Sequence, residues 1–197
     1  MDETQRTGTR RRADVTDLEL VGGVEKRELH LVEPDPAWAA WFAEHAARIR
    51  GALGTTARRL EHIGSTSVPG LAAKPILDVL VTVPDITADE DYVDALVAAG
   101  YVLRVREPGH RLVRTPERDV HVHILEEGDP VADDYLVLRD HLRVDADDRR
   151  LYEETKRDLV ARDWSDMNAY ADAKTEVITA IKARARSRNR RSSGTVT

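Results

Sequence analysis

The run ILDVLVTV, residues 76–83, constrains the fold more than any other segment of the chain. Apart from Asp78 and Thr82 it is apolar, and its length suits a β-strand rather than a helix. A continuous apolar run is typical of a strand that is buried on both faces inside a sheet. A charged Asp78 in such a strand is unfavourable unless its carboxylate is paired or binds a metal ion. The segment therefore predicts an interior strand that carries one acidic residue in need of a partner.

A loop of small residues leads into this strand. The segment RRLEHIG, residues 58–64, is a short strand candidate, and STSVPGLAAKP follows it. A turn at Gly64 and Ser65 lets backbone N–H groups and the Ser hydroxyl approach phosphate oxygens, which predicts phosphate contacts along Gly64, Ser65, Thr66 and Ser67. A carboxylate on the adjacent strand could then hold Mg²⁺ against those phosphates. The structural alternative is that Asp78 accepts hydrogen bonds from the backbone N–H groups of this loop.

The other strand candidates lie at residues 101–105, 110–115 and 119–125. A turn over 116–119 predicts that the last two form an antiparallel pair. A helix begins after Asp35 and Pro36, which suit the cap and the first helical position, and another helix lies between residues 87 and 100. Three more helices are expected after Gly128, starting at Asp129, Asp145 and Ser165. The pattern predicts an α+β fold: a small mixed β-sheet with flanking helices and a C-terminal helical cluster.

Two histidines on the last strand candidate could complete a metal site. His121 and His123 are two residues apart, so their side chains point to the same side of a strand. If residues 119–125 lie beside 76–83, Asp78, His121 and His123 converge. One carboxylate and two imidazoles suit Mn, Fe or Zn better than Mg. The alternative is that both histidines only bond polar neighbours on the sheet.

Composition excludes several classes of protein. The chain of 197 residues has no cysteine, so disulfides, thiolate metal sites and cysteine nucleophiles are excluded. It has a net charge of −6 and no long apolar run, so neither a membrane nor nucleic acid is expected as its main partner. A polar N-terminus without a secretory signal favours a cytoplasmic protein. We expect a flexible N-terminal arm over residues 1–26, one domain over 27–183, and a flexible Arg-rich tail over 184–197 that is solvated or weakly contacts nucleic acid.

The chain resembles the GrpB family. The resemblance is carried by HIGSTSVPGL (62–71), AKP (73–75), Asp78, HVH (121–123), EEG (126–128), LRDHLR (138–143), Tyr152, Lys156, Tyr170 and Lys174. It implies a nucleotidyltransferase-like fold. Some actinobacterial members are fused to dephospho-CoA kinase, where the domain is thought to assist folding or regulation. The present chain lacks the G-x-x-x-x-G-K-[ST] motif of such a kinase.

The resemblance also implies which basic residues face a phosphate-binding cleft. Lys74 could pair with Asp78 or meet a phosphate. Arg111 and Arg114 are three residues apart and so lie on opposite faces of a strand; family members carry a basic residue at Arg111, which favours Arg111 as the residue at the site. Arg139, Lys156 and Lys174 belong to helices that cap the pocket in related folds. The alternative for each of these three is a solvated helix-face charge.

One departure bears on activity. Active nucleotidyltransferases usually place a second carboxylate two residues after the first, and Leu80 stands there. The sequence thus predicts a protein that binds a nucleotide or another phosphorylated small molecule with a divalent metal, Mg²⁺ or Mn²⁺ first, with Fe or Zn open. Transfer of a nucleotidyl group to a small acceptor would use Asp78, Ser65 and Lys74. The alternative is a non-catalytic accessory or regulatory domain of the kind linked to dephospho-CoA kinase. The sequence predicts no oligomeric state.

Overall fold

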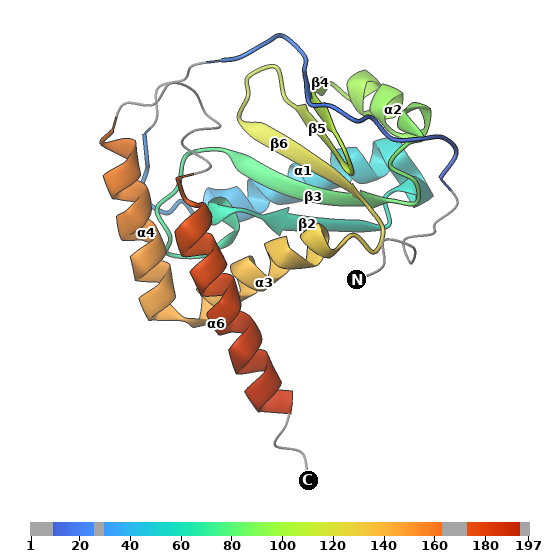
Figure 1. Cartoon of the computed structure of the whole chain (residues 1–197). Helices are drawn as coiled ribbons and strands as arrows, with labels where there is room; N and C mark the ends of the chain where they lie inside the picture. Colours follow the sequence, from blue (N-terminus) through green and yellow to red (C-terminus); the bar gives the residue numbers. More distant parts are fainter. Residues whose placement is uncertain (1–9, 26–29, 163–172, 194–197) are drawn as a thin grey trace.

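The computed structural model describes residues 10–25, 30–162 and 173–193, which form one mixed sheet with helices on both faces (Figure 1). The six strands follow the order β1-β4-β5-β6-β3-β2. Their bounds are β1 Glu19–Leu20, β2 Arg59–Ile63, β3 Leu77–Val83, β4 Val102–Glu107, β5 His110–Arg114 and β6 Val120–Glu126. Strands β3 and β6 are parallel, and the other neighbouring pairs are antiparallel. The expected α+β class, with a small mixed sheet, is confirmed.

Strand β3 is an interior strand, as its apolar run predicts. Successive side chains of a strand point to opposite faces. Leu77, Val79 and Val81 enter the main core together with Val122 and Ile124 of β6. The opposite face of β3 and β6 therefore carries Asp78 and the two histidines of β6.

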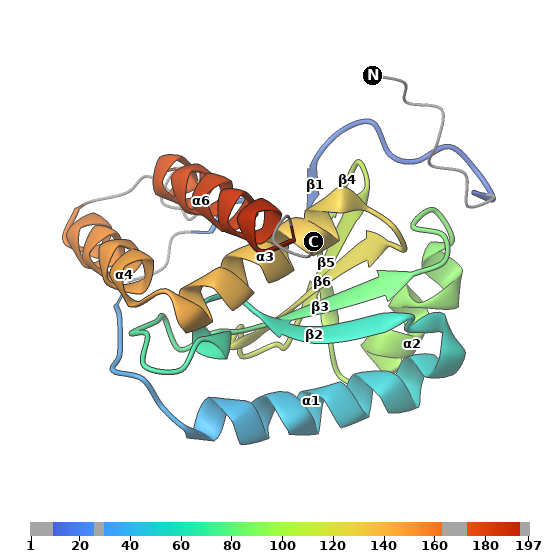
Figure 2. The same cartoon turned by 90° about the horizontal axis from the view of Figure 1, so that it is seen from below.

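The main core lies between the sheet and two helices, α1 Ala37–Leu53 and α2 Val93–Ala98. Figure 2 shows α1 running along one side of the sheet, with α3, α4 and α6 on the other side. The Oδ1 of Asp35 accepts a hydrogen bond from the N–H of Ala37 at 2.8 Å, but Pro36 is the N-cap, so α1 begins one residue later than expected. Short 3₁₀ turns lie at Gly54–Thr56, Ser65–Ser67 and Asp89–Asp91.

The C-terminal helical cluster covers the face of Asp78. It consists of α3 Pro130–Val144, α4 Ala146–Val160 and α6 Thr175–Ser193. Asp129 and Asp145 cap α3 and α4 through their side chains, as the sequence predicts. A separate apolar cluster joins these helices to the loop before β3, and its buried members are Val68, Leu71, Leu142, Tyr152 and Ile181. The helix start expected at Ser165 lies outside the described residues, as does Tyr170.

Both ends of the chain contribute more structure than a flexible arm and tail. Residues 10–25 run along the domain, and β1 pairs with β4 at the sheet edge. Asp14 accepts a hydrogen bond from Arg111 at 2.6 Å, and Glu25 accepts two from Arg114 at 2.9 and 2.7 Å. Helix α6 continues to Ser193, so residues 184–193 are helical rather than a tail. None of the helices in the described ranges is long and apolar enough to cross a membrane.

Candidate functional site

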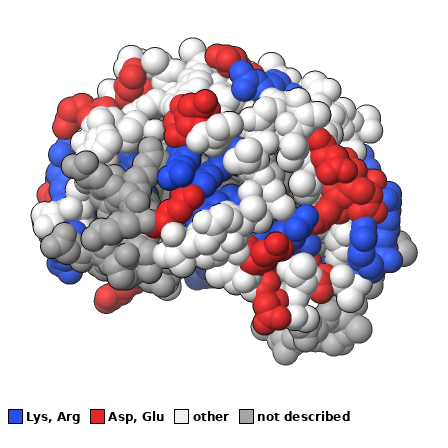
Figure 3. Space-filling view, turned by 90° about the horizontal axis from the view of Figure 1, so that it is seen from above, with Lys and Arg blue, Asp and Glu red and all other residues white. Residues whose placement is uncertain are grey.

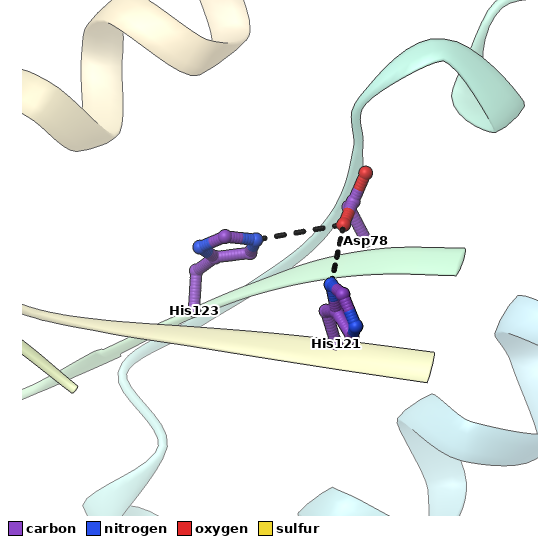
Figure 4. Close-up of side chains that lie close together, drawn as sticks. All are labelled: Asp78, His121 and His123. Carbon is purple, nitrogen blue, oxygen red and sulfur yellow. Dashed lines mark ion pairs between the residues drawn. The ribbon is translucent and has the colours of Figure 1, made fainter. Parts of the chain in front are cut away.

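Asp78, His121 and His123 lie together on the sheet face that the C-terminal helices cover. In the parallel register Asp78 is beside His121, and His123 is beside Leu80. The Oδ1 of Asp78 is 3.7 Å from the Nδ1 of His121 and 3.5 Å from the Nε2 of His123 (Figure 4). One ligand atom from each residue lies within 4.8 Å of the other two, which is the spacing of a metal site. We call these three residues the cleft cluster.

The charge of Asp78 and the neutrality of His121 both suit metal binding. Burial acts to raise the pKa of Asp78, but the proximity of His123, His121 and Lys74 lowers it overall. Burial lowers the pKa of His121 to about 4, although Asp78 opposes the shift. At neutral pH the cluster thus offers a carboxylate and a neutral imidazole, the forms in which these side chains bind metals.

The Gly-Ser turn packs directly against the Asp78 side chain. Gly64 has φ of 69°, and a Cβ at this position would overlap the Asp78 carboxylate, so only glycine fits. Ser65 lines the space beside Asp78. The next two hydroxyls serve the loop itself: Thr66 donates to the carbonyl of Ile76 at 3.3 Å, and Ser67 donates to the carbonyl of Gly64 at 2.6 Å. Both residues are buried, so of the four predicted phosphate contacts the structure brings Gly64 and Ser65 to the cleft.

A cleft of about 410 Å³ opens over the cleft cluster, a volume within the usual range for small-molecule sites. Its walls combine the sheet face, the loop before β3 and helices α3, α4 and α6. Apolar side chains on one part of the wall are Leu31, Leu138, Leu142, Tyr152 and Ile178. Four basic residues also line it: Lys74, Arg139, Lys156 and Lys174. The cleft therefore combines a metal-binding donor set, cationic groups and an apolar wall.

Of these lysines, Lys156 is buried and Lys174 is half-buried. Burial lowers the pKa of Lys156 to about 7, and burial also lowers the pKa of Lys174, against the attraction of Asp78. The ammonium of Lys156 donates to the carbonyl of Ala72 and lies 5.0 Å from the ring centroid of Tyr152. A bound anion would favour the charged form of both lysines. The alternative of a solvated helix-face charge does not fit the burial of Lys156.

The two arginines predicted for the site differ in placement. Arg139 lines the cleft, where its guanidinium donates to Glu61 at 2.8 Å and to the carbonyl of His62 at 3.1 Å. The expectation that Arg111 faces the site is wrong. Arg111 lies opposite Ile124 in the antiparallel register, so its side chain points to the α1–α2 face, where Asp14 and Asp89 pair with it. Arg114, opposite His121, is the arginine on the site face.

Comparison with known proteins places the chain in a family. The sequence profile described as "GrpB protein" matches residues 28–184. The chain belongs to the GrpB family. A UPF0157 protein of Streptomyces coelicolor is 61% identical over 176 residues, which cover 89% of this chain and 94% of the relative.

Two other similar proteins bear on the fold and on the length of the matched region. The crystal structure of the conserved protein GrpB from Enterococcus faecalis superposes with a TM-score of 0.70 at 31% identity, over 79% of this chain and 96% of that one. A dephospho-CoA kinase of Mycolicibacterium paratuberculosis is 31% identical over 180 residues, covering 77% of this chain and 44% of the kinase. The GrpB-like region is thus less than half of that longer protein.

The place of a second carboxylate in this GrpB chain is closed by packing. Leu80 shares the site face with Asp78, but it is fully buried together with Ile63 of β2 and with Ala132 and Leu136 of α3. An acidic side chain there would be buried under α3 rather than exposed to the cleft. The structure therefore gives the leucine a role in attaching α3 to the sheet.

Sequence reasoning missed two residues beside the cleft cluster. His110 of β5 contacts His123, with its Nε2 3.2 Å from the Nδ1 of His123. Tyr135 of α3 also lies beside His123, with 5.6 Å between ring centroids. The antiparallel β5–β6 pair was predicted, and working out its register would have placed His110 on the same face as His123. Tyr135 comes from tertiary packing that no local pattern indicates.

A second group of potential metal ligands lies in the helical cluster. His141 of α3, with Asp145 and Asp148 at the start of α4, also brings three ligand atoms within 4.8 Å of one another. We call these residues the helix cluster. Arg184 of α6 donates to both carboxylate oxygens of Asp148 at 2.9 to 3.0 Å, and His141 contacts Asp148 at 2.7 Å. The Nη1 of Arg188 lies 3.5 Å from the Oδ2 of Asp145.

Proposed function

We propose that this GrpB protein binds a nucleotide or another phosphorylated small molecule in the cleft, together with a divalent metal at Asp78, His121 and His123. The observation that carries the proposal is the combination of this donor set with Lys74, Lys156 and Lys174 around one cleft. A carboxylate with two imidazoles suits Mn, Fe or Zn, and the three ammonium groups suit an anion with several charges.

The chemistry that we propose is transfer of a nucleotidyl group to a small acceptor. The metal would neutralise phosphate oxygens and polarise the phosphorus. Ser65 and the turn at Gly64 contact the phosphates, while Lys74 stabilises the charge that develops on them. The hydroxyl or amine of the acceptor would bond to the α-phosphorus of a nucleoside triphosphate and lose its proton to water, while the bond to the bridging oxygen breaks and pyrophosphate leaves. The apolar wall formed by Leu138 and Tyr152 suits a base or another uncharged part of the ligand.

An accessory role is the second candidate function. The match to a dephospho-CoA kinase supports it, because the GrpB-like region there belongs to a longer protein. The buried Leu80 at the place of a second carboxylate also favours it, since two-metal phosphoryl transfer needs several anionic ligands. In this role the cleft binds a phosphorylated ligand such as CoA without turning it over.

Thermal unfolding with each nucleoside triphosphate and with CoA, with and without Mg²⁺ or Mn²⁺, tests the proposal. A ligand at about 100 times its Kd stabilises the native state by about 2.7 kcal/mol. We expect such a shift in the wild type, its loss in Asp78→Ala, and its retention in Asp94→Ala, an exposed aspartate of α2 on the other side of the sheet. A nucleotide that shifts the transition is then assayed for pyrophosphate release, which separates the enzyme from the accessory protein. No shift with any ligand contradicts the nucleotide proposal.

A further inference from the structure

A chain of hydrogen-bonding groups leads from the cleft cluster to the surface. The Nε2 of His123 faces Asp78, and its Nδ1 lies 3.2 Å from the Nε2 of His110. The Nδ1 of His110 lies 2.6 Å from the Oε1 of Glu107, whose side chain is 41% exposed. The two imidazole planes are inclined by only 20°, which suits a ring-to-ring hydrogen bond through the ring edges.

The β4–β5 hairpin fixes Glu107 and His110 in this position. The connecting residues are Pro108 and Gly109, and Gly109 has φ of 75°. Proline in the second and glycine in the third place of a turn suit type II geometry. The turn makes Glu107 and His110 direct partners in the antiparallel register. The positions of both side chains thus follow from local backbone structure rather than from flexible loops.

Counting hydrogens along the chain assigns its tautomers. A carboxylate only accepts, so Glu107 requires a hydrogen on the Nδ1 of His110. The Nε2 of a neutral His110 is then an acceptor, and it takes the Nδ1–H of His123. This leaves a lone pair on the Nε2 of His123, which points at the Asp78 carboxylate, also an acceptor. In the metal-free protein a proton on this nitrogen would satisfy both groups, and a metal ion shared by Asp78 and His123 satisfies them in its place.

We propose that Glu107 and His110 are positioning residues that hold His123 as the Nδ1–H tautomer and present its Nε2 to a metal ion shared with Asp78 and His121. The metal itself belongs to the proposed function; the assignment to Glu107 and His110 is new. Partners of this kind fix the ring orientation and raise the basicity of a metal-binding histidine, and their loss typically lowers metal affinity about 10–100-fold. The ring of Tyr135, 5.6 Å from that of His123 between centroids, also restricts the space open to His123.

Zinc titrations of the full chain by calorimetry test this assignment, with Zn²⁺ alone as the probe. His110→Phe keeps a ring but removes the acceptor, and we expect it to bind zinc about 10–100-fold more weakly than the wild type. His110→Gln restores an amide oxygen near the Nε2 position, so its affinity should stay close to that of the wild type. Unchanged zinc affinity in His110→Phe overturns the proposal. Equal losses in both variants also overturn it, because the acceptor would then not matter.

The ¹⁵N spectra of the histidine rings supply a readout that packing alone does not move. In the zinc-loaded protein we expect a protonated Nδ1 and a zinc-bound Nε2 for His123, and zinc bound through its Nδ1 overturns the proposal. If the wild type binds no zinc, the metal part of the proposed function fails and the zinc-free spectrum decides the positioning role. That role is supported if the wild type carries a hydrogen on the Nδ1 of His110 and if Glu107→Ala removes the hydrogen bond that this hydrogen makes. A hydrogen on its Nε2 alone overturns it.

Discussion

The cleft cluster and the helix cluster contain the same types of side chain at similar separations, yet their surroundings differ. In both, three potential ligand atoms lie within 4.8 Å of one another. In the helix cluster Arg184 pairs with both oxygens of Asp148, and the side chain of Asp145 caps α4. In the cleft cluster the Asp78 carboxylate lies 3.7 Å from the imidazole of His121 and 3.5 Å from that of His123.

The difference shows that three potential ligand atoms lying close together do not by themselves define a metal site. A guanidinium already neutralises the buried carboxylate of the helix cluster and occupies the lone pairs that a metal would need. In the cleft cluster, burial keeps His121 neutral and Gly64 makes room for the Asp78 carboxylate. The helix cluster therefore joins α3, α4 and α6, and the cleft cluster is where we expect a ligand.

Replacing one aspartate in each cluster should give the largest contrast. We expect Asp78→Asn to weaken zinc binding by more than the roughly 100-fold that loss of an outer partner can cause. Asp148→Asn should leave zinc affinity unchanged, because its carboxylate is already paired. Calorimetric titration of both variants measures this. A comparable loss in Asp148→Asn would place the metal in the helix cluster instead.

The helix cluster, rather than the cleft cluster, should matter more when stability is measured instead of zinc affinity. Asp148→Ala removes the hydrogen bonds from Arg184 and His141 and leaves the buried His141 without this acceptor, so we expect a loss of about 2 kcal/mol in the free energy of unfolding. Asp147→Ala is the matched control, since Asp147 is 87% exposed and its effect should stay within about 0.5 kcal/mol. Urea unfolding compares the variants. An equal loss in the control would mean that the carboxylate of Asp148 has no special role.

The stability contribution of Asp148 should depend on pH. The hydrogen bond from Arg184, together with that from His141, lowers the pKa of Asp148 below its usual value. Its contribution is therefore complete above the unfolded-state pKa of about 3.9 and is lost as pH falls through the folded-state value. Wild type and Asp148→Asn should therefore converge in stability over this acidic range. A constant difference in urea unfolding from pH 6 to pH 3 would contradict the assignment.

Removing the arginines of the helix cluster should make it resemble the cleft cluster. In the double variant Arg184→Ala and Arg188→Ala, Asp148 and Asp145 lose their guanidinium partners while His141 stays in place. We expect the smallest effect here, a second and weaker zinc equivalent in the titration, because the side chain of Asp145 is still engaged in capping α4. If the stoichiometry stays at that of the wild type, charge neutralisation is not what separates the two clusters.

Local patterns predicted most of the fold, because strands and helices follow from residue type and spacing. The apolar run of β3, the β5–β6 pair and the caps at Asp129 and Asp145 are all present. The spacing of His121 and His123 placed both on one face, and the structure brings them to Asp78.

What the sequence did not predict depends on register and on long-range contacts. The face of Arg111 follows from its pairing with Ile124, which resemblance alone could not supply. His110 reaches His123 across the β5–β6 pair, and Leu80 is buried by α3, which comes much later in the chain. The distribution of surface charge, by contrast, agrees with the modest net charge of the sequence. Lys and Arg lie interspersed with Asp and Glu over the described part of the face in Figure 3.

The pairing of Asp14 with Arg111 means that the folding unit begins earlier than the family similarity does. The profile match starts at residue 28, whereas the guanidinium of Arg111, only 2% exposed, takes one of its two carboxylate partners from residue 14. A protein trimmed to the region of similarity would leave a buried cation with half of its counter-charge, and Arg104 and Arg114 would lose Glu25 as well. Residues outside the profile match thus supply counter-charges to arginines inside it.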